Sequence, residues 1–409
     1  MQMPTVLRVL HGRDFRFYWC GQAISLTGTW MQVMAQGWVV TGLSPAASVL
    51  SAVNIASTLP ILLLSVVGGT LADRHEKRRI LIVTQVGMML LAFAMSALVF
   101  SHQIALWHIF VLATSLGLVT AFDLPAAQAF PPELVRRDEI PQAVALMQAI
   151  FHGSRLVGPA VAGVLVAHFG AGSAFLANGL SFLAVLATLL LIPDRAPAPD
   201  GTHSRGHGGI GAGFAYVRRE PLVGKLMTLA ALTTTFIFPF LAVLLVYYVR
   251  HSLAGDARAL GTIFSASGLG ALAGALALLF GDSRRLRLWL WVGVLGCGLA
   301  VLGMSLTHRL LWAVVLVTVL SFAMSSLMGR ISQTIQHVVP NELRGRVMGV
   351  FAMAFTGLMP YAALLLAALA DTFGFERMLQ IGAFLYLGLA AVVLVRVPIP
   401  TAPVAVAQR

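Results

Sequence analysis

The sequence predicts an all-α membrane protein with twelve transmembrane helices in two pseudo-symmetric six-helix bundles. Three observations support this prediction: the composition, the length of the apolar runs and a weak repeat at half the chain length. Of the 409 residues, 58% are hydrophobic and only 10% are charged, and the mean hydropathy is +0.88. Because soluble proteins carry about 25% charged residues, this composition indicates a protein that crosses the membrane many times.

The apolar runs are long enough to be counted as spans, since a transmembrane helix needs about 20 predominantly apolar residues. Twelve stretches qualify: 17–41, 46–72, 80–100, 104–129, 141–169, 173–192, 222–249, 259–280, 288–307, 310–337, 347–370 and 378–396. The first reads as a retained span, because no small-residue cleavage pattern follows a short apolar core. The runs are continuously apolar rather than alternating, which excludes a closed β-barrel.

The distribution of basic residues predicts the orientation. With the N-terminus inside, the cytoplasmic segments hold 20 of the 27 Lys and Arg residues and the outer loops hold four. Positive charge accumulates on the cytoplasmic side of membrane proteins. We therefore expect a multi-pass protein of the bacterial inner membrane with both termini in the cytoplasm.

The longest polar stretch divides the chain into two halves. We expect an N-terminal six-helix bundle at 1–192, a cytoplasmic linker at 193–221 and a C-terminal six-helix bundle at 222–409. A faint repeat supports the division, because Val135 and Val339 follow the fourth and tenth spans and lie 204 residues apart. Two parallel halves with a substrate site at the membrane midplane are typical of transporters.

The loop between the second and third spans carries the most specific motif. It contains one carboxylate and a basic cluster in the order Gly69, Asp73, Arg74, Lys77 and Arg78. This order resembles the loop 2–3 signature of the major facilitator superfamily. The resemblance implies that Asp73 lies against the N-terminal end of span eleven, which begins near Arg346, and closes the cytoplasmic side by charge–dipole attraction. Glu76 departs from the glycine often found in that signature.

Two further regions resemble the same superfamily. Span five carries Gly153, Gly158, Pro159 and Gly163; such glycines allow close helix packing, and the pattern resembles the span-five motif of facilitator antiporters, which favours export. The stretch 121–129 and the chain start at 13–25 resemble the branch that contains enterobactin-type siderophore exporters and macrolide exporters.

Ionisable residues within spans are functional candidates, because each is costly in a bilayer unless it faces protein or water. Four stand out: Asp123, His152, Arg155 and Arg330. Asp123 is the only carboxylate well inside a span, and we hypothesise that it carries the proton beside Arg155 or Arg330. The alternative is a static charge pair that closes the cytoplasmic side. His152 is a candidate for proton relay or substrate binding.

Uncharged polar residues predict the substrate cavity. Span one carries a stripe of polar residues at helical spacing, and spans two and seven add further groups; the candidates are Ser25, Thr29, Gln32, Gln36, Asn54 and Thr234. For Asn54 and Thr234, interhelical hydrogen bonding is the favoured alternative. A cavity with aromatic and amide groups but a single acid suits small amphipathic molecules.

The sequence contains no phosphate-cradling P-loop, no catalytic cluster and no metal-ligand cluster. We therefore expect no cofactor, no metal, no enzymatic activity and no nucleic-acid partner. The prediction is a monomeric secondary transporter that exports a small molecule in exchange for protons by alternating access. A proton-coupled importer, a lipid flippase and, less favoured, a non-transporting receptor remain alternatives; a membrane-embedded enzyme is the least favoured.

Overall fold

The computed structural model describes residues 9–193, 211–280 and 286–396. These residues are almost entirely helical, and no strand occurs among them. Contacts divide the chain into two compact units. The first comprises Met1–Pro45, Ala52–Gly201 and Gly255–Ser265, and the second comprises Ala46–Ser51, Thr202–Ala254 and Ala266–Arg409. The expected boundaries at 192 and 222 stay a prediction, because each unit takes a short segment from the other half of the sequence.

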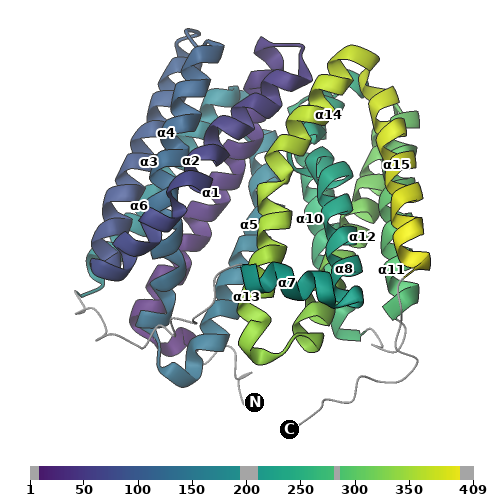
Figure 1. Cartoon of the computed structure of the whole chain (residues 1–409). Coiled ribbons are helices and arrows are strands. Elements are labelled where there is room, and N and C mark those ends of the chain that lie inside the picture. Colours follow the sequence, from purple (N-terminus) through teal and green to yellow (C-terminus); the bar gives the residue numbers. More distant parts are fainter. Residues whose placement is uncertain (1–8, 194–210, 281–285, 397–409) are drawn as a thin grey trace, which may run out of the picture. The chain divides into compact units, whose positions relative to one another are not determined.

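The helices of the first half follow the expected spans closely. They are α1 (Arg13–Leu43), α2 (Ala47–Arg74), α3 (Lys77–Phe100), α4 (Leu106–Ala129), α5 (Ile140–Phe169) and α6 (Ala171–Leu191), drawn in purple to teal in Figure 1. Two short 3₁₀ turns, η2 (Pro131–Leu134) and η3 (Arg137–Glu139), connect α4 to α5. Run length alone predicts these helices well, because the apolar segments end where polar loop residues begin.

The second half has the same plan with more interruptions. It contains α7 (Gly211–Arg219), α8 (Pro221–Phe236), η4 (Phe240–Leu244), α9 (Leu245–Tyr247), η5 (Tyr248–Ser252), α10 (Ala257–Phe280), α11 (Leu286–Leu306), α12 (Leu310–Val338), α13 (Asn341–Ala352), η7 (Met353–Gly357), α14 (Met359–Phe373) and α15 (Phe375–Val395). The segments η4, η5 and η7 are π-helical. Proline flanks two of them, Pro239 before η4 and Pro360 after η7, and its missing N–H disturbs the regular ladder.

Eleven of the described helical segments are long and apolar enough to cross a membrane. The helix α1 is 31 residues long but is not among them, because its polar residues lower the hydropathy of the expected first span. Large apolar side chains are exposed on the spans; Val66 is 75% and Leu311 is 72% exposed. Such surfaces are unfavourable in water and are suited to lipid.

The packing inside each unit repeats. In the first unit α6 packs against both α1 and α3, α4 packs on α3, and α5 packs on α1. In the second unit α15 packs against both α8 and α11, α12 packs on α11, and α14 packs on α8. Each of these helix pairs occupies the same place in its half of the chain. The faint sequence repeat therefore corresponds to a repeated arrangement of helices.

The linker expected at 193–221 lies mostly outside the described residues, but its end forms a helix. The segment α7 packs on α13, where a Cβ added to Gly213 would lie 2.8 Å from the carbonyl oxygen of Arg346. Its outward side chains include Phe214, which is 45% exposed, and the exposed Arg218 and Arg219. The end of the expected linker is therefore a short helix with one buried glycine and an exposed basic end.

Candidate functional site

Asp123 on α4 is held by two side chains of α3. The Thr84 hydroxyl donates to Asp123 Oδ1 at 2.6 Å, and the Gln85 amide nitrogen donates to the same oxygen at 3.0 Å. The other carboxylate oxygen, Oδ2, forms no hydrogen bond with the residues that the structure describes, and the Asp123 residue is partly exposed. Oδ1 thus accepts hydrogen bonds from two neutral donors, while Oδ2 keeps its capacity to accept a hydrogen bond.

The backbone around Asp123 is shaped by a proline and a glycine. Pro125 lies inside α4 and has no N–H to donate to the carbonyl of Ala121. Gly68 of α2 packs directly against that carbonyl, where a Cβ would not fit. This close approach, made possible by Gly68, places α2 against the turn of α4 that carries Asp123.

A buried tyrosine of α1 completes the surroundings of Asp123. Tyr18 has no exposed surface and lies within electrostatic range of Asp123. The Gln22 amide donates to the Tyr18 hydroxyl oxygen at 2.8 Å. The groups around the carboxylate are therefore neutral polar side chains from α1 and α3. Protonation of Asp123 would leave no buried cation among them without its counter-charge.

The basic residues expected beside Asp123 lie elsewhere. The Arg155 guanidinium is 5.5 Å from the Trp30 ring centroid and close enough to His152 to interact electrostatically. His152 itself is exposed, with its ring 5.5 Å from the ring of Phe151. Among the described residues neither Arg155 nor His152 forms an ion pair or hydrogen bond with Asp123, so the structure gives no support to a static Asp123–Arg155 pair.

Arg330 belongs to the second unit and has its own aromatic partner. Its guanidinium lies 4.3 Å from the Trp289 ring centroid, and one terminal nitrogen donates to the Ala277 carbonyl at 3.4 Å. The side chain is buried, and its Nε has no hydrogen-bond partner in the described part of the chain. A cation–π contact of this kind stabilises a buried guanidinium, a role that a carboxylate partner would otherwise have.

The expected polar stripe of α1 is divided between two environments. Ser25 and Gln32 are buried, and Gln32 Oε1 accepts a hydrogen bond of 2.7 Å from Asn178 of α6. Thr29 is exposed and donates to the Ser25 carbonyl at 3.0 Å, while Gln36 is half-buried. The placement of Gln32 corresponds to interhelical bonding, whereas Thr29 and Gln36 keep accessible surface. A role of these residues in substrate binding stays a prediction.

Two other cavity candidates carry buried polar atoms that lack partners. Asn54 Oδ1 and Thr234 Oγ1 form no hydrogen bond within the described chain. The neighbouring Thr233 differs, because its hydroxyl lies 3.1 Å from the Tyr386 hydroxyl. A buried polar atom without a partner is costly, so Asn54 and Thr234 have hydrogen-bonding capacity that a water or a ligand would satisfy.

Two basic residues of the loop 2–3 motif connect the start of α3 to other segments of the first unit. Lys77 pairs with Glu133 at 2.6 Å, and Arg78 Nε donates to the Leu189 carbonyl at 2.6 Å. Glu76 pairs with Arg79 at 2.6 Å while its Oε1 stays buried without a partner. Asp73 and Arg74 are exposed, and a Cβ at Gly69 would meet no atom within 4 Å. The expected contact of Asp73 with span eleven stays a prediction.

The span-five glycines serve helix packing at two of three positions. A Cβ at Gly158 would lie 2.7 Å from the Thr27 carbonyl oxygen of α1, and one at Gly163 would lie 3.1 Å from Gly261 Cα of α10. A Cβ at Gly153 would meet nothing within 4 Å. Pro159 is buried beside Gly261, whose Cβ would lie 2.7 Å from the Pro159 carbonyl oxygen. Packing is therefore sufficient to explain Gly158 and Gly163.

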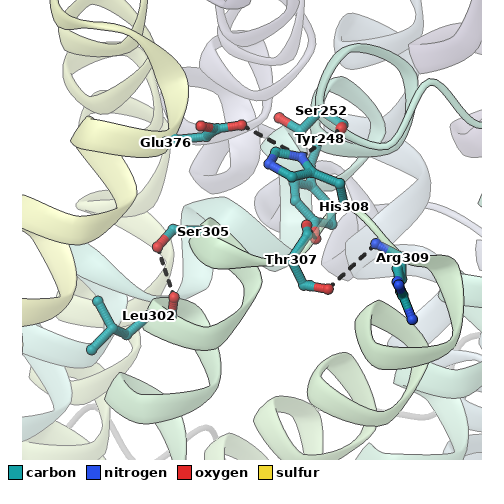
Figure 2. A network of polar contacts seen from close by, with 8 residues as sticks. All are labelled: Tyr248, Ser252, Leu302, Ser305, Thr307, His308, Arg309 and Glu376. Atoms are coloured by element: carbon teal, nitrogen blue, oxygen red, sulfur yellow. Dashed lines mark hydrogen bonds and ion pairs between the residues drawn. The ribbon is translucent and has the colours of Figure 1, made fainter.

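A second polar cluster joins the loops of the second unit at the end that the charge distribution places outside (Figure 2). His308 Nδ1 lies 3.2 Å from the Ser252 carbonyl and 3.8 Å from Glu376, and the Tyr248 hydroxyl donates to the Thr307 carbonyl at 3.1 Å. An open pocket of about 420 Å³ adjoins this cluster, lined in part by Tyr247, His251, Phe375 and Glu376.

Sequence reasoning missed Thr84, Gln85 and Tyr18 as partners of Asp123. A signal existed for the first two, because they are adjacent polar residues in the otherwise apolar span 80–100. The neighbouring helix that they face could not be inferred, because a span that is apolar on all sides does not show which of its faces points into the protein.

Comparison with known proteins decides the family. The family model described as "Transmembrane secretion effector", a major facilitator group, matches residues 5–408. The chain belongs to this family. It is therefore a multi-pass membrane transporter of small molecules and not an enzyme, and its fold is the all-α major facilitator fold.

Similar proteins include named exporters. Macrolide efflux protein A of Streptococcus pyogenes is 24% identical, with 92% of this chain and 95% of that protein aligned. The enterobactin exporter EntS of Escherichia coli O1:K1 is 28% identical over 73% of this chain and 71% of that protein. The staphyloferrin A transporter of Staphylococcus aureus is 31% identical, but the match spans only 44% of this chain and 45% of that protein.

Solved structures share the fold. A bacterial homologue of the human lysosomal transporter Spinster gives a TM-score of 0.71 at 14% identity, covering 96% of this chain and 97% of that one. A bacterial homologue of the iron transporter ferroportin gives 0.71 at 16% identity, covering 94% and 98%.

Proposed function

We propose that this protein exports a small amphipathic molecule across the bacterial inner membrane in exchange for protons, by alternating access, with Asp123 as the proton-carrying group. Similarity to siderophore, macrolide and multidrug exporters supports the direction of transport. The observation that carries the proposal is the setting of Asp123, a carboxylate inside a span with neutral hydrogen-bond donors as its partners.

The two partners on α3 suit both protonation states of Asp123. A hydroxyl can donate to a carboxylate or accept from a carboxylic acid, so Thr84 can reverse its role. Gln85 presents its amide nitrogen to Asp123, while its buried Oε1 has no partner among the described residues. A turn of that amide would offer Oε1 as an acceptor for a protonated Asp123. Neither state leaves an unpaired cation beside the site.

A static charge pair, the alternative role of Asp123, would require a cation within about 4 Å. Arg155 lies over the Trp30 ring instead, and Asp123 forms no ion pair with the residues that the structure describes. This arrangement favours the proton role. Substrate contacts are proposed for Thr29, Gln36, Asn54 and Thr234, which retain exposed surface or unpartnered polar atoms.

The test is the intracellular accumulation of dyes, macrolides and siderophores in a bacterial host that lacks its own exporters. The chain should lower accumulation of at least one compound, and both a protonophore and Asp123→Asn should abolish the effect. The matched control is Asp138→Asn, because the Asp138 side chain is 70% exposed outside the spans.

Three outcomes distinguish the rival functions. If accumulation is lowered equally by the wild type and by Asp123→Asn, the protein is an exporter but Asp123 is not its proton-carrying group. Higher accumulation would indicate an importer. Binding of a compound without any change in flux, with the protein verified in the membrane, would indicate a receptor and contradict the proposal.

A further inference from the structure

Asp371 lies in the last turn of α14 and caps the beginning of α2. Its Oδ1 accepts a hydrogen bond from the Ala47 backbone N–H at 2.7 Å, and its Oδ2 accepts one from the Ser48 N–H at 3.0 Å. Because α2 begins at Ala47, these are two of the N–H groups that no carbonyl within the helix can satisfy. Both oxygens of one carboxylate are thus engaged by a single helix N-terminus.

The position of Asp371 on its own helix is unfavourable. A carboxylate in the last turn meets the negative end of the helix dipole, whereas the first turn of another helix offers the positive end. The Asp371 carboxylate is therefore stabilised by the N-terminus of α2 and destabilised by the C-terminus of its own helix, α14. Tyr247 of α9 also lies within electrostatic range of the Asp371 carboxylate. The expected span 347–370 ended one residue too early to include Asp371.

A second contact joins the same two helices. The Ser51 hydroxyl donates to the Ala363 carbonyl of α14 at 3.1 Å. Ala46–Ser51 belongs to the second unit, whereas α2 from Ala52 onward belongs to the first. The Asp371 cap is therefore a contact within the second unit, on the first turn of a helix whose remainder belongs to the first unit.

The helix α10 is divided in the corresponding way, but its carboxylate cap comes from the adjacent residue Asp256, whose Oδ1 accepts a hydrogen bond from the Ala259 N–H at 2.8 Å. Its beginning, Gly255–Ser265, belongs to the first unit. There the Ser265 hydroxyl donates to the Leu156 carbonyl at 3.1 Å, and Arg258 donates to His168 Nε2 at 2.9 Å. The start of α10 is thus capped by its neighbour Asp256, whereas the start of α2 is capped by Asp371 from another helix.

Asp73 and Asp371 occupy matching places. Asp73 is in the last turn of α2, and Asp371 is in the last turn of α14. The family resemblance implies that Asp73 faces the beginning of span eleven on the cytoplasmic side. The structure has Asp371 on the beginning of α2, at the end that the charge distribution places outside.

We propose that Asp371 is an outer latch, a carboxylate that holds the first turn of α2 while the outer end is closed and releases it when the outer end opens. The proposal rests on alternating access. Asp73 and Asp371 then form a reciprocal pair in which each span ends in an aspartate that caps the start of the other. Loss of the latch should favour the outward-open state by a factor of about 2 to 30 in the conformational equilibrium.

The experiment measures distances between spin labels in the full chain in lipid nanodiscs, after replacement of Cys20 by Ser and Cys297 by Ala. One label pair occupies the exposed loop positions 103 and 309 at the outer end, and a second occupies 137 and 342 at the inner end. Asp371→Asn keeps the shape and removes the charge, and Asp371→Ala removes both acceptors. Both should increase the population with a longer outer distance and a shorter inner distance.

The matched control is Glu376→Gln, since Glu376 is an acid at the same end whose described partner is His308. It should leave both distance distributions as in the wild type. Unchanged distributions in both Asp371 variants would overturn the proposal, and so would equal broadening of both label pairs without a shift. If Asp371→Ala does not fold, Asp371→Asn decides.

These distances are measured without substrate or a proton gradient, so they do not depend on the identity of the cargo. A chain that fails to export but responds to Asp371→Asn would keep the latch and reject the proposed export function. A chain that exports but shows no response would keep the transport assignment and reject the latch.

Discussion

Two glycines of span five should respond in opposite ways to the same substitution. A Cβ at Gly158 would lie 2.7 Å from the Thr27 carbonyl oxygen and 2.7 Å from Trp30 Cβ, whereas one at Gly153 would meet nothing within 4 Å. Ordinary contact begins near 3.4 Å, so α5 and α1 would have to separate by about 0.7 Å at Gly158, the difference between these distances. We expect Gly158→Ala to destabilise the protein and Gly153→Ala to be neutral or stabilising.

The magnitude follows from two terms. Replacing glycine by alanine inside a helix stabilises it by about 0.5–1 kcal/mol at either position, so this term cancels between the variants. Overpacking costs about 1–3 kcal/mol and acts at Gly158 alone. The difference in unfolding free energy between the variants should therefore be about 1–3 kcal/mol, which corresponds to a few degrees in Tm.

The assay is thermal unfolding of the purified full chain, followed by tryptophan fluorescence at one heating rate for both variants. Trp30, one of the seven tryptophans, lies at the Gly158 contact and contributes to this signal. A Tm for Gly158→Ala equal to or above that for Gly153→Ala would refute the close packing of α5 against α1.

Two other predictions concern the first unit. Lys77→Gln and Glu133→Gln should show a coupling of about 0.5–1 kcal/mol in a double-mutant cycle of thermal stability, because their 2.6 Å ion pair is only partly exposed; additive effects would mean that the pair contributes nothing. Thr84→Val should lower proton-driven transport about tenfold by removing the 2.6 Å donor to Asp123. The control Thr120→Val, which removes a hydrogen bond only to its own helix at Leu116, should transport at the wild-type rate, and equal losses in the two variants would contradict the special role of Thr84.

The helices were largely predictable from the sequence because run length controls where an apolar helix ends. The expected span 80–100 corresponds to α3 (Lys77–Phe100), and 310–337 corresponds to α12 (Leu310–Val338). The π-helical breaks in spans seven and eleven were not predicted. Pro239 and Pro360 mark their neighbourhood, but the change of hydrogen-bond register depends on how neighbouring helices satisfy the freed backbone groups.

The site was predictable in its central residue and not in its partners. Asp123 stands out because a carboxylate in an apolar span is costly. Its neighbours depend on helix rotation, which an all-apolar span does not encode, so Arg155 or Arg330 was expected beside Asp123, where the structure has Thr84 and Gln85. Asp371 was missed for a different reason. A residue at the edge of a span resembles an ordinary loop acid until the partner helix is known.

The central claim is that Asp123 exchanges protons during transport, and proton flux tests it most directly. Purified protein would be reconstituted in liposomes that contain a pH-sensitive dye, with a substrate identified in the accumulation screen added on one side. Substrate movement should drive proton movement in the opposite direction in the wild type and in Asp138→Asn, and Asp123→Asn should abolish that proton movement. Undiminished substrate-driven proton flux in Asp123→Asn would contradict the account.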